Sequence, residues 1–65
     1  MTRFAAIFSR VDGLDETDIG NSYGLNAESL EEAEGEALGM GPPSGANLLK
    51  ILDEGRVVKR HGIGL

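Results

Sequence analysis

Carboxylates are the side chains of this chain with the greatest capacity for chemistry. Eleven of its 65 residues are Asp or Glu, and the segment 11–49 holds nine of them without one Lys or Arg. A pair of carboxylates can serve as general acid and general base when a cleft desolvates one of them and raises its pKa. A domain of this size rarely has room for such a cleft. The acids therefore indicate a binding surface, and we expect no enzymatic activity.

The other residue types argue against a nucleophilic catalytic site and against a metal site. His61 is the one candidate general base, no motif connects it with a serine, and the chain has no Cys to act as a nucleophile or form a disulfide. A zinc site with one His and no Cys would rest almost wholly on carboxylates, contrary to the usual ligand sets. We therefore expect no metal and no cofactor. The lack of Cys is typical of a reducing compartment, so a cytoplasmic location is expected.

Two short runs have the composition of ion or phosphate sites but not their spacing. In the run 12–18, Gly13 directly follows the first Asp, whereas an EF-hand loop places Gly at its sixth position. The run 39–45 is rich in glycine but lacks the lysine of a phosphate-binding loop, and its two prolines have no amide hydrogen to donate. We interpret the first run as an acidic turn or loop, and the second as a helix stop with a rigid connection.

Hydrophobic periodicity predicts the elements that must position the acids. Alternating apolar residues are typical of strands, whereas Ala and Leu at spacings of three and four after residue 29 are typical of a helix of about ten residues. Ser29 and Glu32 fit a capping box, in which the Ser29 hydroxyl accepts from the Glu32 amide and the Glu32 carboxylate accepts from the Ser29 amide. Gly39 or Gly41 can end the helix. The expected strands are residues 3–11, 19–27, 46–52 and 57–63.

This β-β-α-β-β order predicts a single α+β domain over residues 1–65, with one four-stranded antiparallel sheet and a short helix packed on one face. The first strand has apolar residues on both faces, so we expect it to be central in the sheet or to meet a partner. The glycines of the second strand favour a bulge, and residues 53–55 favour a hairpin turn. The expected buried residues are Phe4, Ile7, Phe8, Tyr23, Leu25, Leu30, Ala33, Ala37, Leu49, Ile51 and Val57.

Acidic residues adjoin one another on the predicted helix with no Lys between them. Like charges three or four residues apart on a helix cost about 0.2–0.5 kcal/mol per pair. A cationic partner would account for such a surface, and the alternative is a solvated face that keeps the protein soluble. The residues that we expect to contact a partner are Asp15, Glu16, Asp18, Glu31, Glu34 and Glu36.

The basic residues argue against direct nucleic-acid or membrane binding. A nucleic-acid-binding domain would be basic and carry stacking aromatics, but this chain has a net charge of −5, two Phe, one Tyr and no Trp. The negative charge also disfavours anionic membrane surfaces, and no run approaches the ~20 apolar residues that span a bilayer. We interpret the basic residues of the last predicted hairpin as protection of edge strands, or as the second half of a dipolar surface: Lys50, Arg56, Lys59 and Arg60.

The chain has two resemblances to known families. Segment 23–33 resembles a strand-into-helix pattern of small phage and mobile-element proteins, in which Ala-x-Ser ends an alternating strand and Glu-Glu-Ala opens a helix. The order of elements is similar to that of small anti-CRISPR proteins. This resemblance implies a protein that binds a CRISPR effector and blocks DNA access or conformational change without chemistry.

The second resemblance is to the N-terminal domain of HicB-type antitoxins. It is carried by Phe4–Phe8 followed by Asp12-Gly13, and by Ser29–Ala33 followed by Ala37-Leu38. It implies a domain that covers the RNA-binding surface of a toxin.

These observations predict a non-enzymatic, phage-encoded, anti-CRISPR-like inhibitor. Its acidic surface would act as a nucleic-acid mimic and occlude a basic nucleic-acid-binding surface of a host defence complex in the bacterial cytoplasm. One alternative is a HicB-like antitoxin that neutralises an RNA-binding toxin. The other is a phage structural or scaffold protein that self-associates, as a homodimer or larger assembly, through the second face of the first strand and the last hairpin.

Overall fold

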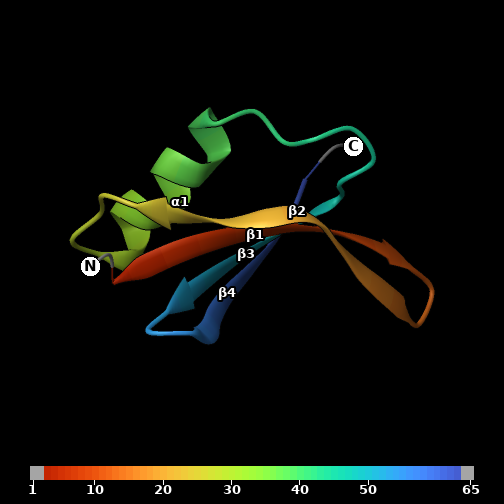
Figure 1. Cartoon of the computed structure of the whole chain (residues 1–65), viewed down its shortest axis with the longest axis horizontal. Coiled ribbons are helices and arrows are strands. Elements are labelled where there is room, and N and C mark those ends of the chain that lie inside the picture. Colours follow the sequence, from red (N-terminus) through yellow and green to blue (C-terminus); the bar gives the residue numbers. More distant parts are fainter. Residues whose placement is uncertain (1–2, 64–65) are drawn as a thin grey trace.

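The computed structural model describes residues 3–63 and confirms the expected α+β architecture (Figure 1). Four strands form one antiparallel sheet in the order β2-β1-β3-β4, and one helix lies across a face of that sheet. The central position of β1 agrees with the apolar residues on both of its faces. The elements are β1 (Phe4–Asp12), β2 (Asp15–Leu25), α1 (Leu30–Gly39), β3 (Leu48–Asp53) and β4 (Arg56–Gly62).

The first hairpin is longer than the sequence indicates. Asp12 pairs with Asp15, so the turn consists of Gly13 and Leu14 alone, and Gly13 has a φ of 62°. Glycine at the first central position is the requirement of a type II′ hairpin turn. The interpretation of residues 15–18 as part of a loop is therefore wrong, because they form the start of β2. In Figure 1 this hairpin extends past the other two strands.

A bulge in β2 keeps its apolar residues on the helix side of the sheet. Ala6 pairs with Tyr23 and Phe8 pairs with Ile19, so residues 20–22 lie opposite Ile7 alone. This irregularity confirms the bulge that the glycines predict, and Gly20 in it has a φ of 78°. Because a strand alternates its faces, the two extra residues leave Ile19 and Tyr23 on the same face of the sheet.

Local capping defines the start of α1. The Glu32 amide donates to Ser29 Oγ at 3.2 Å, which confirms Ser29 as the N-cap. The other half of the predicted capping box is wrong by one residue, because the Glu32 carboxylate accepts from the Glu28 amide at 3.0 Å. The buried helix residues are Ala33 and Ala37, whose small side chains allow the helix to lie close to the sheet.

The core lies between α1 and the sheet face beneath it. Burial is wrongly predicted for Tyr23, Leu30 and Val57, which are 39%, 37% and 48% exposed, and Ile7 is only half-buried. Val57 is exposed because it pairs with Leu52, and this register places it on the sheet face that the ten-residue helix does not cover. The hydrophobic core consists of Phe4, Ala6, Phe8, Leu25, Ala33, Ala37, Leu49 and Ile51.

Candidate functional site

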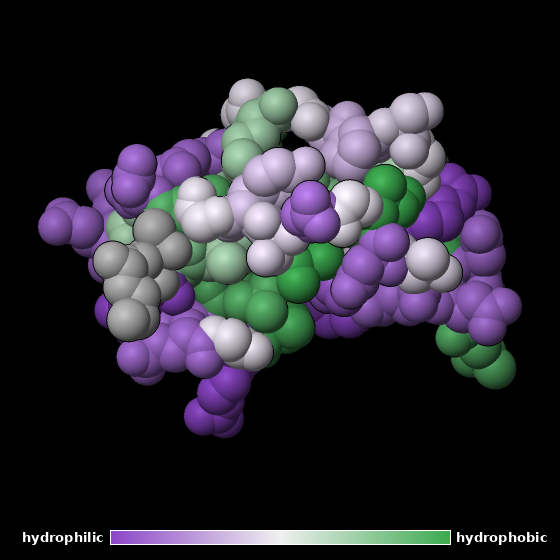
Figure 2. Space-filling model, viewed as in Figure 1, coloured by the Kyte–Doolittle hydropathy of each residue, from purple (hydrophilic) through white to green (hydrophobic). Residues whose placement is uncertain are grey.

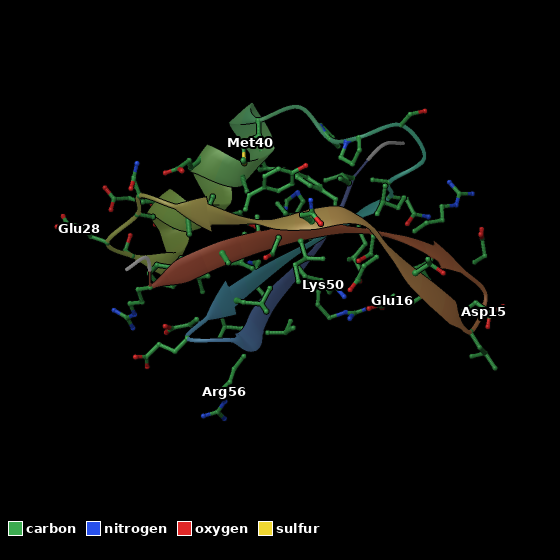
Figure 3. The ribbon with its side chains drawn as sticks, in the orientation of Figure 1. Asp15, Glu16, Glu28, Met40, Lys50 and Arg56 are labelled. Atoms are coloured by element: carbon green, nitrogen blue, oxygen red, sulfur yellow. The ribbon has the colours of Figure 1, made fainter. Side chains whose placement is uncertain are left out.

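The six acids predicted to contact a partner lie in two separate places. Asp15, Glu16 and Asp18 belong to β2, whereas the other three belong to α1. Figure 3 shows Asp15 at one end of the molecule and Glu28, just before the helix, at the other. The structure therefore does not bring the predicted residues together on one surface.

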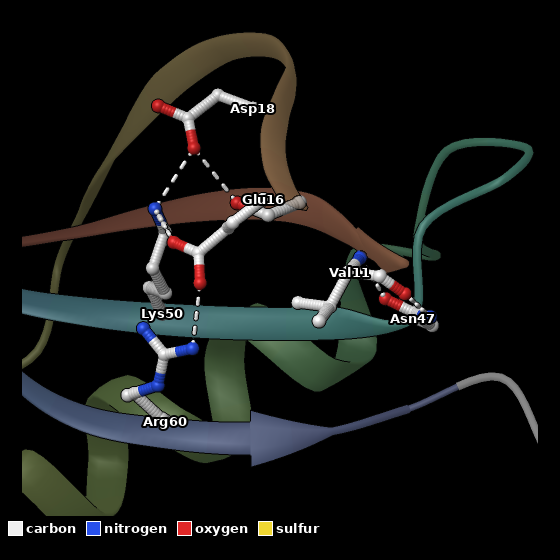
Figure 4. A network of polar contacts seen from close by, with 7 residues as sticks. Val11, Glu16, Asp18, Asn47, Lys50 and Arg60 are labelled. Atoms are coloured by element: carbon white, nitrogen blue, oxygen red, sulfur yellow. Dashed lines mark hydrogen bonds and ion pairs between the residues drawn. The ribbon is translucent and has the colours of Figure 1, made fainter. Parts of the chain in front are cut away.

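The β2 acids join a network of ion pairs on the sheet face opposite the helix (Figure 4). Lys50 Nζ lies 2.9 Å from Glu16 Oε2 and 2.8 Å from Asp18 Oδ1, while Arg60 Nη2 lies 2.6 Å from Glu16 Oε1. Ser9 Oγ donates to Asp18 Oδ1 at 2.8 Å. This sheet network therefore contains residues from all four strands, and its central residue, Lys50, is only 8% exposed.

Each member of the sheet network favours the charged state of its neighbours. Hydrogen bonds from Arg60 and Lys50 lower the pKa of Glu16 below its ordinary 4.5, and those from Lys50 and Ser9 lower the pKa of Asp18 below 3.8. The bond to Asp18, followed by that to Glu16, raises the pKa of Lys50 above 10.5 although burial opposes this. The two acids and the two basic residues of the network are thus held in their charged states, and their charges sum to zero.

Two of the predicted helix acids also bind groups of this chain. Glu34 Oε2 lies 2.8 Å from His61 Nδ1 and 3.9 Å from Lys59 Nζ. These two contacts join α1 to β4. Both carboxylate oxygens of Glu36 lie 3.1 Å from the backbone nitrogen of Asn26 and accept its hydrogen. Glu34 and Glu36 therefore position the helix on the sheet, a role that the sequence did not indicate.

The sequence places no basic residue among the acids of segment 11–49, which suggests that their charges are uncompensated. This is wrong for Glu16, Asp18 and Glu34, which form ion pairs in the folded chain. Their cationic partners lie between 25 and 44 residues away in the sequence, on β3 and β4. No local spacing could reveal them, because only the folded sheet brings these strands opposite the acids. The available signal was the cluster of basic residues on the last hairpin.

The acids on and next to the helix differ from those of β2. Glu28, Glu31, Glu32 and Glu36 are all exposed, and within residues 3–63 none of them forms an ion pair. Glu32 and Glu36 are four residues apart, the spacing of neighbours on a helix surface, and Glu28 lies just before the N-cap Ser29. We call this set the acidic helix surface. The sequence predicted two of its members as contacts, assigned Glu32 to the cap and missed Glu28.

The basic residues of the chain do not neutralise this surface. Five of the six form ion pairs with other acids, and these are Arg3, Arg10, Lys50, Lys59 and Arg60. The sixth, Arg56, projects from the β3–β4 hairpin away from the helix in Figure 3. Negative charge therefore concentrates at α1, where its field would attract a cationic group.

Within residues 3–63 no three His, Asp or Glu side chains gather as a metal-binding group. In the same range, each buried side-chain nitrogen or oxygen has a hydrogen-bond partner. The acidic helix surface offers an array of carboxylates to Lys or Arg side chains.

Comparisons with known proteins leave the family open. No protein-family model matches the chain, and no curated protein or solved structure is significantly similar to it. The resemblances to anti-CRISPR proteins and HicB-type antitoxins stay predictions. Among residues 3–63, no helix combines the length and the apolar character that a membrane crossing requires.

Proposed function

We propose that this chain is a non-enzymatic inhibitor that docks its acidic helix surface on a basic, nucleic-acid-binding surface of another protein. By the resemblance to anti-CRISPR proteins, that protein belongs to a bacterial defence complex, and the inhibitor is encoded by a phage and acts in the host cytoplasm. The supporting observation is the unequal distribution of charge. Five of the six cations pair with acids outside the acidic helix surface, and the four carboxylates of that surface are left for an external partner.

The helix geometry supports this use of the carboxylates. A rigid helix fixes the spacing of its side chains, so the acids can meet several cations at once without ordering a mobile loop. Glu32 and Glu36 accept hydrogen bonds from backbone amides, which restrains their side chains without neutralising their charge. A partner whose basic residues hold nucleic-acid phosphates would find negative groups of similar chemistry on this surface.

The test reverses the charge of two acids whose side chains form no hydrogen bond or ion pair within residues 3–63. Glu28→Lys combined with Glu31→Lys changes the charge of the surface by four units and leaves the fixed contacts of Glu34 and Glu36 in place. We expect the wild-type chain to capture nucleic-acid-binding proteins from a bacterial lysate, identified by mass spectrometry. We expect the double variant to lose them, and added salt to weaken the wild-type capture.

A matched control carries the same charge change outside the proposed contact. Asp15→Lys with Glu54→Lys alters two exposed acids, one at the start of β2 and one in the β3–β4 turn. Neither of them forms an ion pair within residues 3–63. This control should capture the same proteins as the wild type. Equal capture by the Glu28/Glu31 variant, or captured proteins that do not bind nucleic acid, would contradict the proposal. Capture of an RNA-binding toxin would identify the chain as an antitoxin that inhibits its target through the same acidic helix surface.

A further inference from the structure

The sheet face opposite the helix carries a row of apolar residues that the fold leaves uncovered. Ala5 pairs with Leu52, and Leu52 pairs with Val57, so the row crosses β1, β3 and β4. Ile7 lies on the same face two residues along β1. Val57 is 48% exposed and the other three are half-buried. An antiparallel sheet with one solvated face ordinarily has polar residues there. Figure 2 shows the hydrophobic area over the sheet below the helix.

The rest of this open face has no net charge. Next to the apolar row lies the sheet network, in which Lys50 and Arg60 balance Glu16 and Asp18. The chain as a whole carries −5, and the acidic helix surface lies in the layer on the other side of the sheet. A strongly basic or acidic partner would therefore gain little from the open face. In a pair with a second copy of the chain, no like charges meet at the contact itself, since the acidic helices then lie on the outside.

From this distribution of charge and apolar side chains we infer that two copies of the chain form a symmetric dimer through their open sheet faces. The dimer has four layers, in the order helix, sheet, sheet and helix. A stable interface takes roughly 800 Å² from each partner, which is about a fifth of the 4331 Å² surface of this chain. The dimer therefore uses the apolar row together with the adjoining sheet network. The acids and bases of that network already form ion pairs with one another, so no unpaired charge enters the interface.

Analytical ultracentrifugation across concentrations up to about 1 mM tests the dimer. We expect the mass of the wild-type species to reach twice the 6.9 kDa of one chain. Added salt should leave the dimer unchanged or tighten it, because two chains of like net charge repel each other at a distance. A wild-type chain that stays monomeric throughout, or a dimer that dissociates in salt, would overturn the inference.

Substitution of the exposed row residue locates the interface. Val57→Lys should weaken the dimer on the order of 100-fold, because symmetry places the substitution twice in the interface. The milder Val57→Thr, which keeps the shape of the side chain, should weaken it roughly tenfold and guards against loss of the fold. The control is Leu38→Lys on the helix layer, where Leu38 is 40% exposed. The inference is wrong if Leu38→Lys disrupts the dimer, or if both Val57 variants dimerise as the wild type does. Circular dichroism verifies that each variant is folded.

Discussion

At the scale of single residues, Asn47 has the most specific structural role that the sequence did not indicate. Its side-chain oxygen accepts from the Val11 amide at 2.8 Å, and its side-chain nitrogen donates to the Val11 carbonyl at 3.0 Å. Its own backbone amide donates to the Ser9 carbonyl at 2.9 Å. Asn47 thus continues the pairing of β1 beyond the start of β3 at Leu48 (Figure 4). A carboxamide can imitate a peptide group because it has both a donor and an acceptor.

Substitution of Asn47 should separate its two hydrogen bonds. We expect Asn47→Ala to lower the free energy of unfolding by about 2 kcal/mol, since both half-buried Val11 groups lose their partner. Asn47→Asp keeps the acceptor but turns a carboxylate oxygen toward the Val11 carbonyl, and about 1 kcal/mol of destabilisation is expected. Urea denaturation measures both values. Asn21→Ala, in the exposed bulge, is the control and should have little effect. Unchanged stability of Asn47→Ala would show that water replaces the amide without loss.

At the scale of elements, local patterns sufficed for the helix and for the order of elements along the chain, because capping and alternation depend on neighbours in the sequence. The order of the strands within the sheet depends on long-range pairing and was not predicted. The start of β2 was mispredicted for the opposite reason. Asp and Glu disfavour strands, and the cations that fix Glu16 and Asp18 come from β3 and β4. Burial of Val57 was mispredicted because alternation identifies a face of a strand but does not tell whether a helix covers it. The candidate site was predictable as an acidic helix, but not which of its acids are paired.

A glycine within α1 permits a test of the helix itself. Gly35 has ordinary backbone angles, and an added Cβ would meet no atom within 4 Å. Gly35→Ala should therefore stabilise the protein by about 1 kcal/mol, the difference in helix propensity, and raise Tm by roughly 4–8 °C. Gly55→Ala is a matched control, since its Cβ also meets nothing within 4 Å but its φ is 86°. We expect it to destabilise the β3–β4 turn by about 1–2 kcal/mol. A lower Tm in Gly35→Ala would mean that the added methyl group collides with neighbouring atoms on the helix surface.

At the scale of the whole molecule, the chain separates its charges into layers. The sheet holds balanced pairs, including Arg3 with Asp53, whose atoms Nε and Oδ1 lie 2.9 Å apart. The helix layer carries the acidic helix surface. The core of this domain is thin and lies on one side of the sheet. Ion pairs between distant strands therefore add contacts that help to hold the sheet together. The same separation leaves one layer negatively charged and the opposite sheet face neutral.

The layered charges predict how stability depends on pH. The pKa values of Glu16, Asp18 and Asp53 are lowered by their cationic partners, from ordinary values of 4.5, 3.8 and 3.8. A group with a lowered pKa stabilises the folded state above its ordinary value, and that contribution is lost as pH falls through the folded pKa. The free energy of unfolding should therefore decline below about pH 4.5. The pKa of Lys50 is raised above 10.5, so its contribution is complete below that value and is lost only at higher pH.

Lys50→Met isolates the part of this acid sensitivity that belongs to the sheet network. The methionine keeps the apolar stem of Lys50 but removes its charge, so Glu16 retains Arg60 and Asp18 retains only Ser9. At pH 7 we expect a loss of about 1 kcal/mol, modest because both carboxylates can be hydrated once released. Between pH 5 and pH 3 the variant should lose less stability than the wild type, because the pKa of Asp18 returns toward its ordinary 3.8. Urea denaturation at each pH measures the difference. Parallel profiles of the two proteins would show that Lys50 does not set the pKa of its neighbours, and that the network contributes through packing of its aliphatic stems alone.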